Sequence, residues 1–174
     1  MKHILLLLLS FFVPVVWGQQ VEQFKLWPDK PEAGEAEIFV YHPAKGGKAA
    51  PAVLICPGGG YDHHSPREGE AVAVKMLELG YNAVVLRYSL APYVYPTQVY
   101  EAAYTVKWVR DHAKEWDVNP DRIILAGFSA GGHLAACLGT MWSGDMVASF
   151  AKKYLGCDKE CVRPDGLLLG YPVI

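Results

Sequence analysis

The chain has 174 residues, 52% of them hydrophobic and 20% charged, and its formal net charge is −2 at pH 7. This length suits one domain, and this composition is typical of a globular protein with enough apolar residues to build a core. The near-neutral charge gives no sign of a nucleic-acid partner.

Residues 1–18 have the features of a secretory signal peptide. Met1-Lys2-His3 gives a basic start, residues 4–16 are apolar, and Gly18 places a small residue at the end. The apolar stretch is shorter than the ~20 residues that a membrane-spanning helix needs. We therefore expect cleavage near Gly18, no membrane anchor, and a mature domain that begins at Gln19 in the periplasm or outside the cell.

Three strands and a helix are predicted in the first part of the mature chain. Val21–Trp27 and Glu37–His42 have the pattern of antiparallel strands at the edge of a sheet. Ala52–Cys56 is short and continuously apolar, as expected for a parallel strand covered on both faces. Ser65-Pro66-Arg67-Glu68 combines a capping box with a proline at the first helical position, which predicts a helix that runs to Leu79.

Two further strands and a long helix are predicted in the middle of the chain. The first strand, Asn82–Leu86, is followed by an aromatic loop, Arg87–Pro96. Apolar residues recur at helical spacing from Val99 to Ala113 and predict a long amphipathic helix. Asn119-Pro120-Asp121 is predicted as a turn before the second strand, Ile123–Ala126.

The remaining elements complete an alternating pattern of strands and helices. Residues 132–138 predict a helix directly after a glycine-rich turn, Met146–Tyr154 predicts a short helix, and Gly166–Tyr171 predicts a last strand. Strands that alternate with helices and are joined by right-handed crossovers form a doubly wound α/β sheet. We therefore expect a mostly parallel sheet with helices on both faces.

The four cysteines fall into two groups. Cys56 ends an apolar strand and Cys137 lies inside the helix after the glycine-rich turn, so both are expected to be buried apolar residues. Cys157 and Cys161 flank a polar connection, and their spacing can bring the two Cα atoms within disulfide range. In an oxidising compartment they form either a disulfide or two free thiols.

The pentapeptide Gly127–Gly131, with the sequence GFSAG, places a serine between a strand and a helix. A side chain on Gly127 or Gly131 would collide with the adjoining strand or helix at such a sharp turn, which pushes Ser129 out toward substrate. Ser129 is therefore the candidate nucleophile. The alternative is a glycine-rich loop that closes an ordinary βα unit.

A serine nucleophile also needs backbone N–H groups that stabilise the oxyanion of the tetrahedral intermediate. The amide of Ala130 is one candidate, because it lies at the start of a helix. The loop Pro57–Tyr61, with the sequence PGGGY, follows a strand and is the candidate for the second donor. Three consecutive glycines are entropically costly and make sense where the backbone itself faces a ligand, although a flexible surface turn is the alternative.

At this point the chain resembles the α/β-hydrolase superfamily, and more narrowly the bacterial esterases of the hormone-sensitive-lipase and acetyl-esterase/feruloyl-esterase group. The resemblance rests on motifs that occur in order along the chain: Pro57–Tyr61, Tyr88–Pro92, Asn119–Arg122, Gly127–Ala135 and Gly170–Ile174. It implies the α/β-hydrolase fold and ester hydrolysis without a metal or cofactor. By the resemblance Ser129 is the nucleophile, and Gly59 and Gly60 supply loop N–H groups beside that of Ala130, with neither glycine singled out.

None of the six histidines is assigned as the catalytic base. Tyr61, His63 and His64 are expected to border the substrate pocket. No metal site is expected at His63 and His64 beside Asp62, because adjacent side chains diverge and no further ligand motif is visible. His133, one helical turn after Ser129, is expected to pack under the Gly127–Gly131 turn, which is called the elbow below.

The resemblance implies that the triad aspartate and histidine follow two more strands after the one that ends at Tyr171. We therefore expect residues 19–174 to be the N-terminal part of a catalytic domain, with both triad partners beyond residue 174. As given, the chain is expected to be inactive.

The expected function is that of a secreted serine carboxylesterase acting on a small-molecule or polysaccharide ester. Export and the resemblance together favour removal of acetyl or other acyl groups from plant polysaccharide. Two alternatives are a serine peptidase of the prolyl-oligopeptidase type and a non-catalytic binding protein on a hydrolase scaffold. The acyl group, the alcohol and the oligomeric state stay open.

Overall fold

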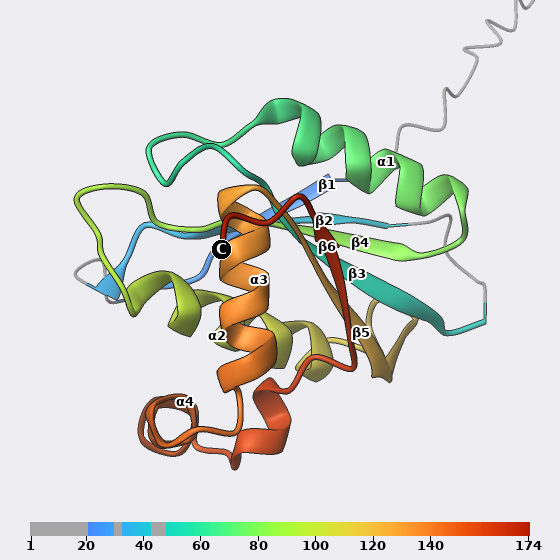
Figure 1. Ribbon diagram of the computed structural model, residues 1–174. Helices are drawn as coiled ribbons and strands as arrows, with labels where there is room; N and C mark the ends of the chain where they lie inside the picture. Colours follow the sequence, from blue (N-terminus) through green and yellow to red (C-terminus); the bar gives the residue numbers. More distant parts are fainter. Residues whose placement is uncertain (1–20, 30–32, 43–47) are drawn as a thin grey trace, which may run out of the picture.

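The computed structural model describes residues 21–29, 33–42 and 48–174 (Figure 1). The expected signal peptide, residues 1–18, lies outside the described residues. Across the described ranges, no helix combines the length and the apolar character needed to cross a membrane.

The described strands form one mixed sheet in the order β1-β2-β4-β3-β5-β6. β1 pairs antiparallel with β2, and β2 with β4, whereas the remaining pairs are parallel. The strand bounds are β1 (Val21–Lys25), β2 (Glu37–Tyr41), β3 (Ala50–Cys56), β4 (Asn82–Arg87), β5 (Val118–Phe128) and β6 (Gly166–Gly170). The prediction of a mostly parallel sheet with an antiparallel edge is confirmed.

Helices cover both faces of the sheet, as Figure 1 shows. α1 (Glu70–Glu78) packs on one face, against β3 and β4. α2 (Thr97–Asp111) and α3 (Ala130–Met141) pack on the other face, against β5. A short α4 (Asp145–Phe150) continues into the π-helical turn η3 (Ala151–Leu155).

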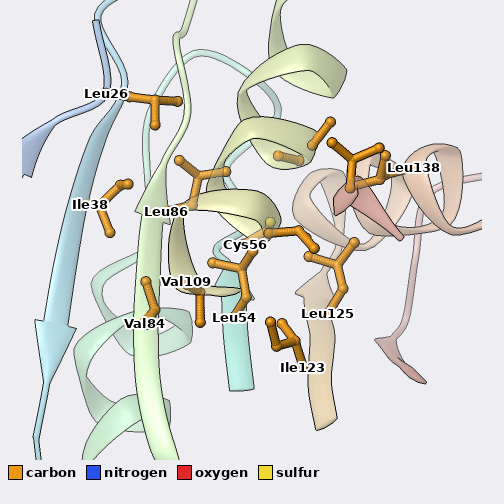
Figure 2. Close-up of a cluster of buried hydrophobic side chains, with 14 of the residues drawn as sticks. Leu26, Ile38, Leu54, Cys56, Val84, Leu86, Val109, Ile123, Leu125 and Leu138 are labelled. Carbon is orange, nitrogen blue, oxygen red and sulfur yellow. The ribbon is translucent and has the colours of Figure 1, made fainter. Parts of the chain in front are cut away.

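The core divides along β3, whose side chains alternate between the two faces. Val53 and Ile55 belong to the smaller cluster under α1, while Leu54 and Cys56 belong to the larger cluster under α2 and α3. Figure 2 shows Leu54 within this larger cluster, beside Leu125 of β5. Burial on both sides explains why β3 is continuously apolar rather than alternating.

β5 is longer than the sequence indicated. Val118 pairs with Ala50 and Ile123 with Ala52, so residues 119–122 form a bulge opposite the single residue between those two partners. The amide of Asp121 donates to the Asn119 side chain at 3.0 Å, so the local turn chemistry is present. The turn that was predicted before the Ile123 strand therefore lies inside β5, because Val118 already pairs with β3 and pairing resumes after the bulge.

The predicted helix from Ser65 to Leu79 is interrupted. Pro66–Glu68 form the 3₁₀ turn η2, and α1 begins only at Glu70. Ser65 makes no side-chain capping bond. The capping-box prediction was wrong, because the Glu68 carboxylate accepts a hydrogen bond from a distant loop instead.

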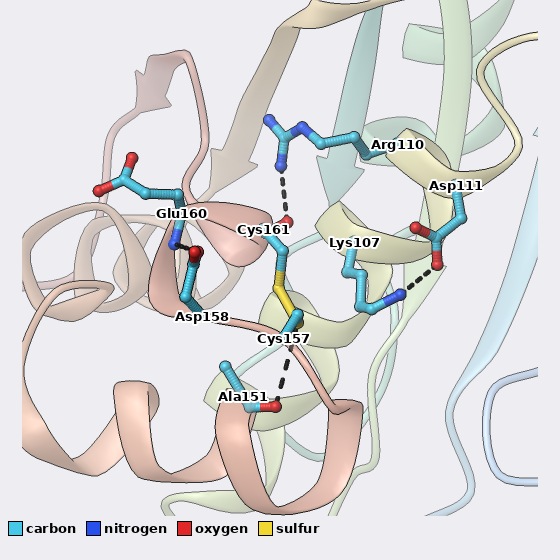
Figure 3. The surroundings of a disulfide bond; sticks show 8 residues. All are labelled: Lys107, Arg110, Asp111, Ala151, Cys157, Asp158, Glu160 and Cys161. Atoms are coloured by element: carbon cyan, nitrogen blue, oxygen red, sulfur yellow. Dashed lines mark hydrogen bonds and ion pairs between the residues drawn. A yellow bond between two sulfur atoms is a disulfide. The ribbon is translucent and has the colours of Figure 1, made fainter.

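Cys157 and Cys161 form a disulfide with an Sγ–Sγ distance of 2.10 Å and a Cα–Cα distance of 6.4 Å. Of the two alternatives left open by the sequence, a disulfide or two free thiols, the structure contains the disulfide. Figure 3 shows that the Arg110 side chain of α2 donates to the carbonyl oxygen of Cys161, at 2.6 Å. The same guanidinium also reaches Asp165 at 3.0 Å, so the disulfide-bridged connection before β6 is held against α2.

Candidate active site

Ser129 lies at the sharp turn where β5 ends and α3 begins, with φ 50° and ψ −118°. A Cβ on Gly127 would lie 2.1 Å from the carbonyl oxygen of Gly131, and a Cβ on Gly131 would lie 2.1 Å from that of Cys56. Both distances are far below van der Waals contact. The predicted steric reason for the two glycines is confirmed, one clash being with the helix and the other with β3.

Backbone hydrogen bonds hold Ser129 in this uncommon conformation. Its N–H donates to Gly170 O at 3.1 Å, and its carbonyl oxygen accepts from Val173 N at 3.1 Å and from His133 N at 3.0 Å. A residue in a sparsely populated backbone region persists only where its surroundings over-determine it. Here the last residue of β6 and the segment that follows it supply two of the three restraints.

The glycine loop that follows β3 lies directly against Ser129. A Cβ on Gly58 would lie 2.9 Å from the Ser129 Cβ. Gly59 has φ +132° and Gly60 has φ +65°, and a Cβ on Gly59 would lie 2.1 Å from the carbonyl oxygen of His63. The loop is a tight turn in which Gly59 O accepts the amides of Asp62 and His63 at 3.2 Å.

The amides expected to hold an oxyanion make no internal hydrogen bond. Over the ranges that the structure describes, the N–H groups of Gly59, Gly60 and Ala130 donate to no protein group, whereas the N–H of Gly58 donates to Glu68. Unpaired donors at a helix start and in a neighbouring glycine loop are suited to an anion. This arrangement can stabilise a negative oxygen formed next to Ser129.

Tyr61 and His133 connect the glycine loop to α3. The Tyr61 hydroxyl lies 2.8 Å from His133 Nδ1, and the two rings meet edge to face with centroids 6.0 Å apart. Burial raises the pKa of Tyr61 above its usual value. His133 is exposed, so the prediction that it packs under the elbow was wrong: the helix face that carries Ser129 and His133 turns toward the loop rather than the sheet.

His63 and His64 line a cavity of about 460 Å³ together with Arg87 and Ser89. His63 is exposed and its Nδ1 lies 2.5 Å from Asp62 Oδ1. His64 is half-buried against the Tyr88 ring, and burial together with the Arg87 charge lowers its pKa.

The structure therefore separates the three residues expected at the pocket. His63 and His64 line one cavity, whereas Tyr61 lies against α3.

Glu101 is a buried carboxyl group that sequence reasoning missed. Its side chain accepts hydrogen bonds from the Ser89 amide at 2.8 Å, the Ser89 hydroxyl at 2.5 Å and Trp27 Nε1 at 3.4 Å. Burial raises the pKa of Glu101 to about 7. The sequence signal that could have identified it is a glutamate inside the apolar stripe of α2. The Glu101 side chain is fully buried in the structure. The contacts tie the loop after β4 to the segment after β1.

Glu101→Gln is expected to remove a pH dependence of stability. The carboxyl titrates near 4.5 when exposed and near 7 when folded, so the folded state keeps a proton that the unfolded state releases. The free energy of unfolding therefore falls as pH rises from 4.5 to 7, by about 3 kcal/mol at about 1.4 kcal/mol per pKa unit. Urea unfolding across this range checks the slope, with exposed Glu115→Gln as the control. Equal slopes in wild type and Glu101→Gln would contradict the prediction.

No group of three or more His, Cys, Asp or Glu side chains is arranged to hold a metal ion within the described ranges.

The BD-FAE family model matches residues 38–160 of the chain. Among curated proteins, the chain is 30% identical over 142 residues to acetylxylan esterase from Xylanibacter ruminicola, which covers 81% of this chain and 26% of that protein. It is also 30% identical over 126 residues to endo-1,4-beta-xylanase B from Butyrivibrio fibrisolvens, which covers 70% of this chain and 19% of that protein.

Two solved structures are similar over most of the chain. The carboxylesterase Cest-2923 from Lactobacillus plantarum WCFS1 has a TM-score of 0.73 and 32% identity, and the match covers 89% of this chain and 57% of that one. The acetyl ester-xyloside bifunctional hydrolase from Caldicellulosiruptor lactoaceticus has a TM-score of 0.74 and 32% identity, covering 88% and 57%. The chain thus spans under three fifths of these structures, and about a fifth to a quarter of the two curated relatives.

Proposed function

Because this chain belongs to the BD-FAE family of α/β-hydrolases, we propose that it is a serine esterase in which Ser129 attacks the carbonyl carbon of an acyl ester. The observation that carries the proposal is the elbow itself. Ser129 has positive φ between two glycines that have no room for a Cβ, and it lies against a glycine loop with unused amides.

In the proposed reaction, a base takes the proton of the Ser129 hydroxyl as Oγ bonds to the ester carbonyl carbon, and the carbonyl oxygen becomes an oxyanion. The base later gives this proton to the departing alcohol. The N–H of Ala130 and an N–H of Gly59 or Gly60 would donate to this oxygen. Collapse of the tetrahedral intermediate releases the alcohol and leaves an acyl group on Ser129. Attack by water then releases the acid and restores the hydroxyl.

We propose that the base comes from outside residues 1–174. His133 is engaged with Tyr61, His63 is paired with exposed Asp62, and the His64 ring packs against that of Tyr88. The described histidines also include His42 and His112, whose rings pack on Trp116. His42 directly follows Tyr41, which pairs with Ala83 near the start of β4, so this cluster lies at the end of the sheet opposite Ser129.

We propose acetyl or other acyl groups on plant polysaccharide as the substrate of the exported protein. The support is sequence similarity to an acetylxylan esterase and structural similarity to an acetyl ester-xyloside bifunctional hydrolase. The amino-terminal pattern of residues 1–18 supports export, and N-terminal sequencing of the secreted protein should then begin at Gln19.

The natural full-length enzyme is expected to release acetate both from nitrophenyl acetate and from acetylated xylan. Acetate release from each substrate, measured in parallel with a Ser129→Ala variant, checks the proposal. Cleavage of nitrophenyl acetate without any release from acetylated xylan would contradict the polysaccharide assignment and leave the esterase assignment intact. Serine-independent release from both substrates would contradict the mechanism.

A further inference from the structure

The carboxylate of Glu68 joins two segments that are far apart in the sequence. Glu68 Oε2 accepts a hydrogen bond from the Gly58 amide at 2.8 Å, and Oε1 accepts one from the Tyr171 hydroxyl at 2.6 Å. Glu68 lies in η2 and is partly buried. One carboxylate thus holds the glycine loop after β3 and the segment after β6.

The segment that carries Tyr171 also holds the nucleophile. Gly170 O accepts the Ser129 amide and the Val173 amide donates to Ser129 O, each at 3.1 Å. Tyr171 itself has φ 35°, an uncommon conformation for a residue with a side chain. The backbone of residues 170–173 therefore anchors Ser129, while the Tyr171 side chain from the same segment anchors Glu68.

Gly58 lies between the Glu68 carboxylate and Ser129. A Cβ on Gly58 would lie 2.5 Å from Glu68 Oε2 and 2.9 Å from the Ser129 Cβ, so the loop is packed between the carboxylate and the nucleophile. Because the Gly58 amide donates to Glu68, that amide is not available to an oxyanion. The amides of the next two residues, Gly59 and Gly60, have no protein acceptor and remain available to an oxyanion.

We propose that Glu68 is a positioning residue, which sets the distance between the Gly59 and Gly60 amides and the Ser129 hydroxyl by bridging Gly58 to Tyr171. The proposal rests on the esterase function proposed above. Hydrogen bonds to a charged acceptor are roughly twice as strong as neutral ones, which suits a bridge that must hold a loop in place. The hydrogen bond to Glu68 also raises the pKa of Tyr171, which provides a readout that is independent of catalysis.

Four variants of the natural full-length enzyme test the proposal by kinetics with nitrophenyl acetate. Glu68→Ala is expected to lower kcat by about 100-fold with KM changed by less than about threefold, because displaced oxyanion donors act on the transition state. Glu68→Gln is expected to recover most of this loss, since its amide can accept from Gly58 and donate to the Tyr171 oxygen. Tyr171→Phe is expected to lower kcat by about fivefold, less than Glu68→Ala because the Gly58 contact remains. Glu70→Ala, an exposed neighbour, serves as the control and is expected to match wild type.

Wild-type kcat in Glu68→Ala would overturn the proposal, and so would a Gln variant as slow as the Ala variant, which would indicate proton transfer by Glu68 instead. If Glu68→Ala does not fold, Tyr171→Phe decides, because removing this exposed hydroxyl spares the core; unchanged kcat there overturns the bridge.

Failure of the proposed function is recognised separately: absence of wild-type turnover contradicts the esterase function, and turnover that survives in Ser129→Ala contradicts the serine mechanism. In either case the Tyr171 pKa, followed by NMR of labelled tyrosine, still tests the contact. It is expected to fall toward its usual value in Glu68→Ala, and an unchanged Tyr171 pKa would overturn the bridge.

Discussion

Ser129→Ala is expected to lower kcat for nitrophenyl acetate by at least about 10⁴-fold in the natural full-length protein, in line with loss of the nucleophile in well-studied serine hydrolases. The thermal transition should stay nearly unchanged. Within the described part of the chain the Ser129 hydroxyl makes no hydrogen bond, and alanine retains the Cβ that already tolerates φ 50°.

Exposed Ser143 in the turn after α3 provides the matched control, because Ser143→Ala removes a hydroxyl close to the same helix without touching the elbow. A fluorophosphonate probe should label the wild type on the peptide that contains Ser129 and should not label Ser129→Ala. Retention of more than a few per cent of turnover in Ser129→Ala would remove this residue from its proposed role.

Gly59→Ala is expected to lower kcat by roughly 10²–10³-fold, which is the effect of losing one oxyanion donor. Its φ of +132° is unfavourable for any side chain, and the new Cβ would lie 2.1 Å from the carbonyl oxygen of His63. The loop must therefore shift, and its amides shift with it. Steady-state kinetics with nitrophenyl acetate measure the loss, which should appear in kcat rather than in KM.

Gly80→Ala is the control for backbone strain alone. Gly80 has φ +85° with nothing within 4 Å of a Cβ, and it lies after α1, away from Ser129. This variant is expected to lose stability by about 1 kcal/mol or more while keeping kcat. If Gly59→Ala also keeps wild-type kcat, the glycine loop is a turn and not part of an oxyanion hole.

The elbow and the strands beside it could be predicted from sequence because their causes are local. The two glycines that make room for the sharp turn at Ser129 lie two residues before and after it. The continuous apolar run of β3 indicates burial on both faces of the strand, whichever helices cover them. Such features depend on nearest neighbours along the chain and on the period of a strand. Cys157 and Cys161 are also close in sequence, but their spacing is compatible with either a disulfide or two free thiols. The folded connection, which is held against α2, contains the disulfide.

The partners of individual polar side chains could not be predicted in this way. Glu68 matched a capping box, but its carboxylate binds Gly58 and Tyr171, 10 and 103 residues away. His133 lay one turn after Ser129 in sequence, but the side of α3 that is covered by the loop decides its contact with Tyr61. Glu101 was missed in the sequence, because its donors come from the loop after β4 and from Trp27 after β1.

The sequence by itself determined the fold class, the nucleophile candidate and the glycine loop, since steric exclusion at a turn and apolar periodicity act within a few residues. Only the tertiary structure decided how that loop is held against Ser129 and where the bulge in β5 falls. The physical reason is that each polar group can bind any of the groups that the fold brings within about 3 Å, and the fold determines which of these contacts form. The partners that bind are often on segments distant in sequence.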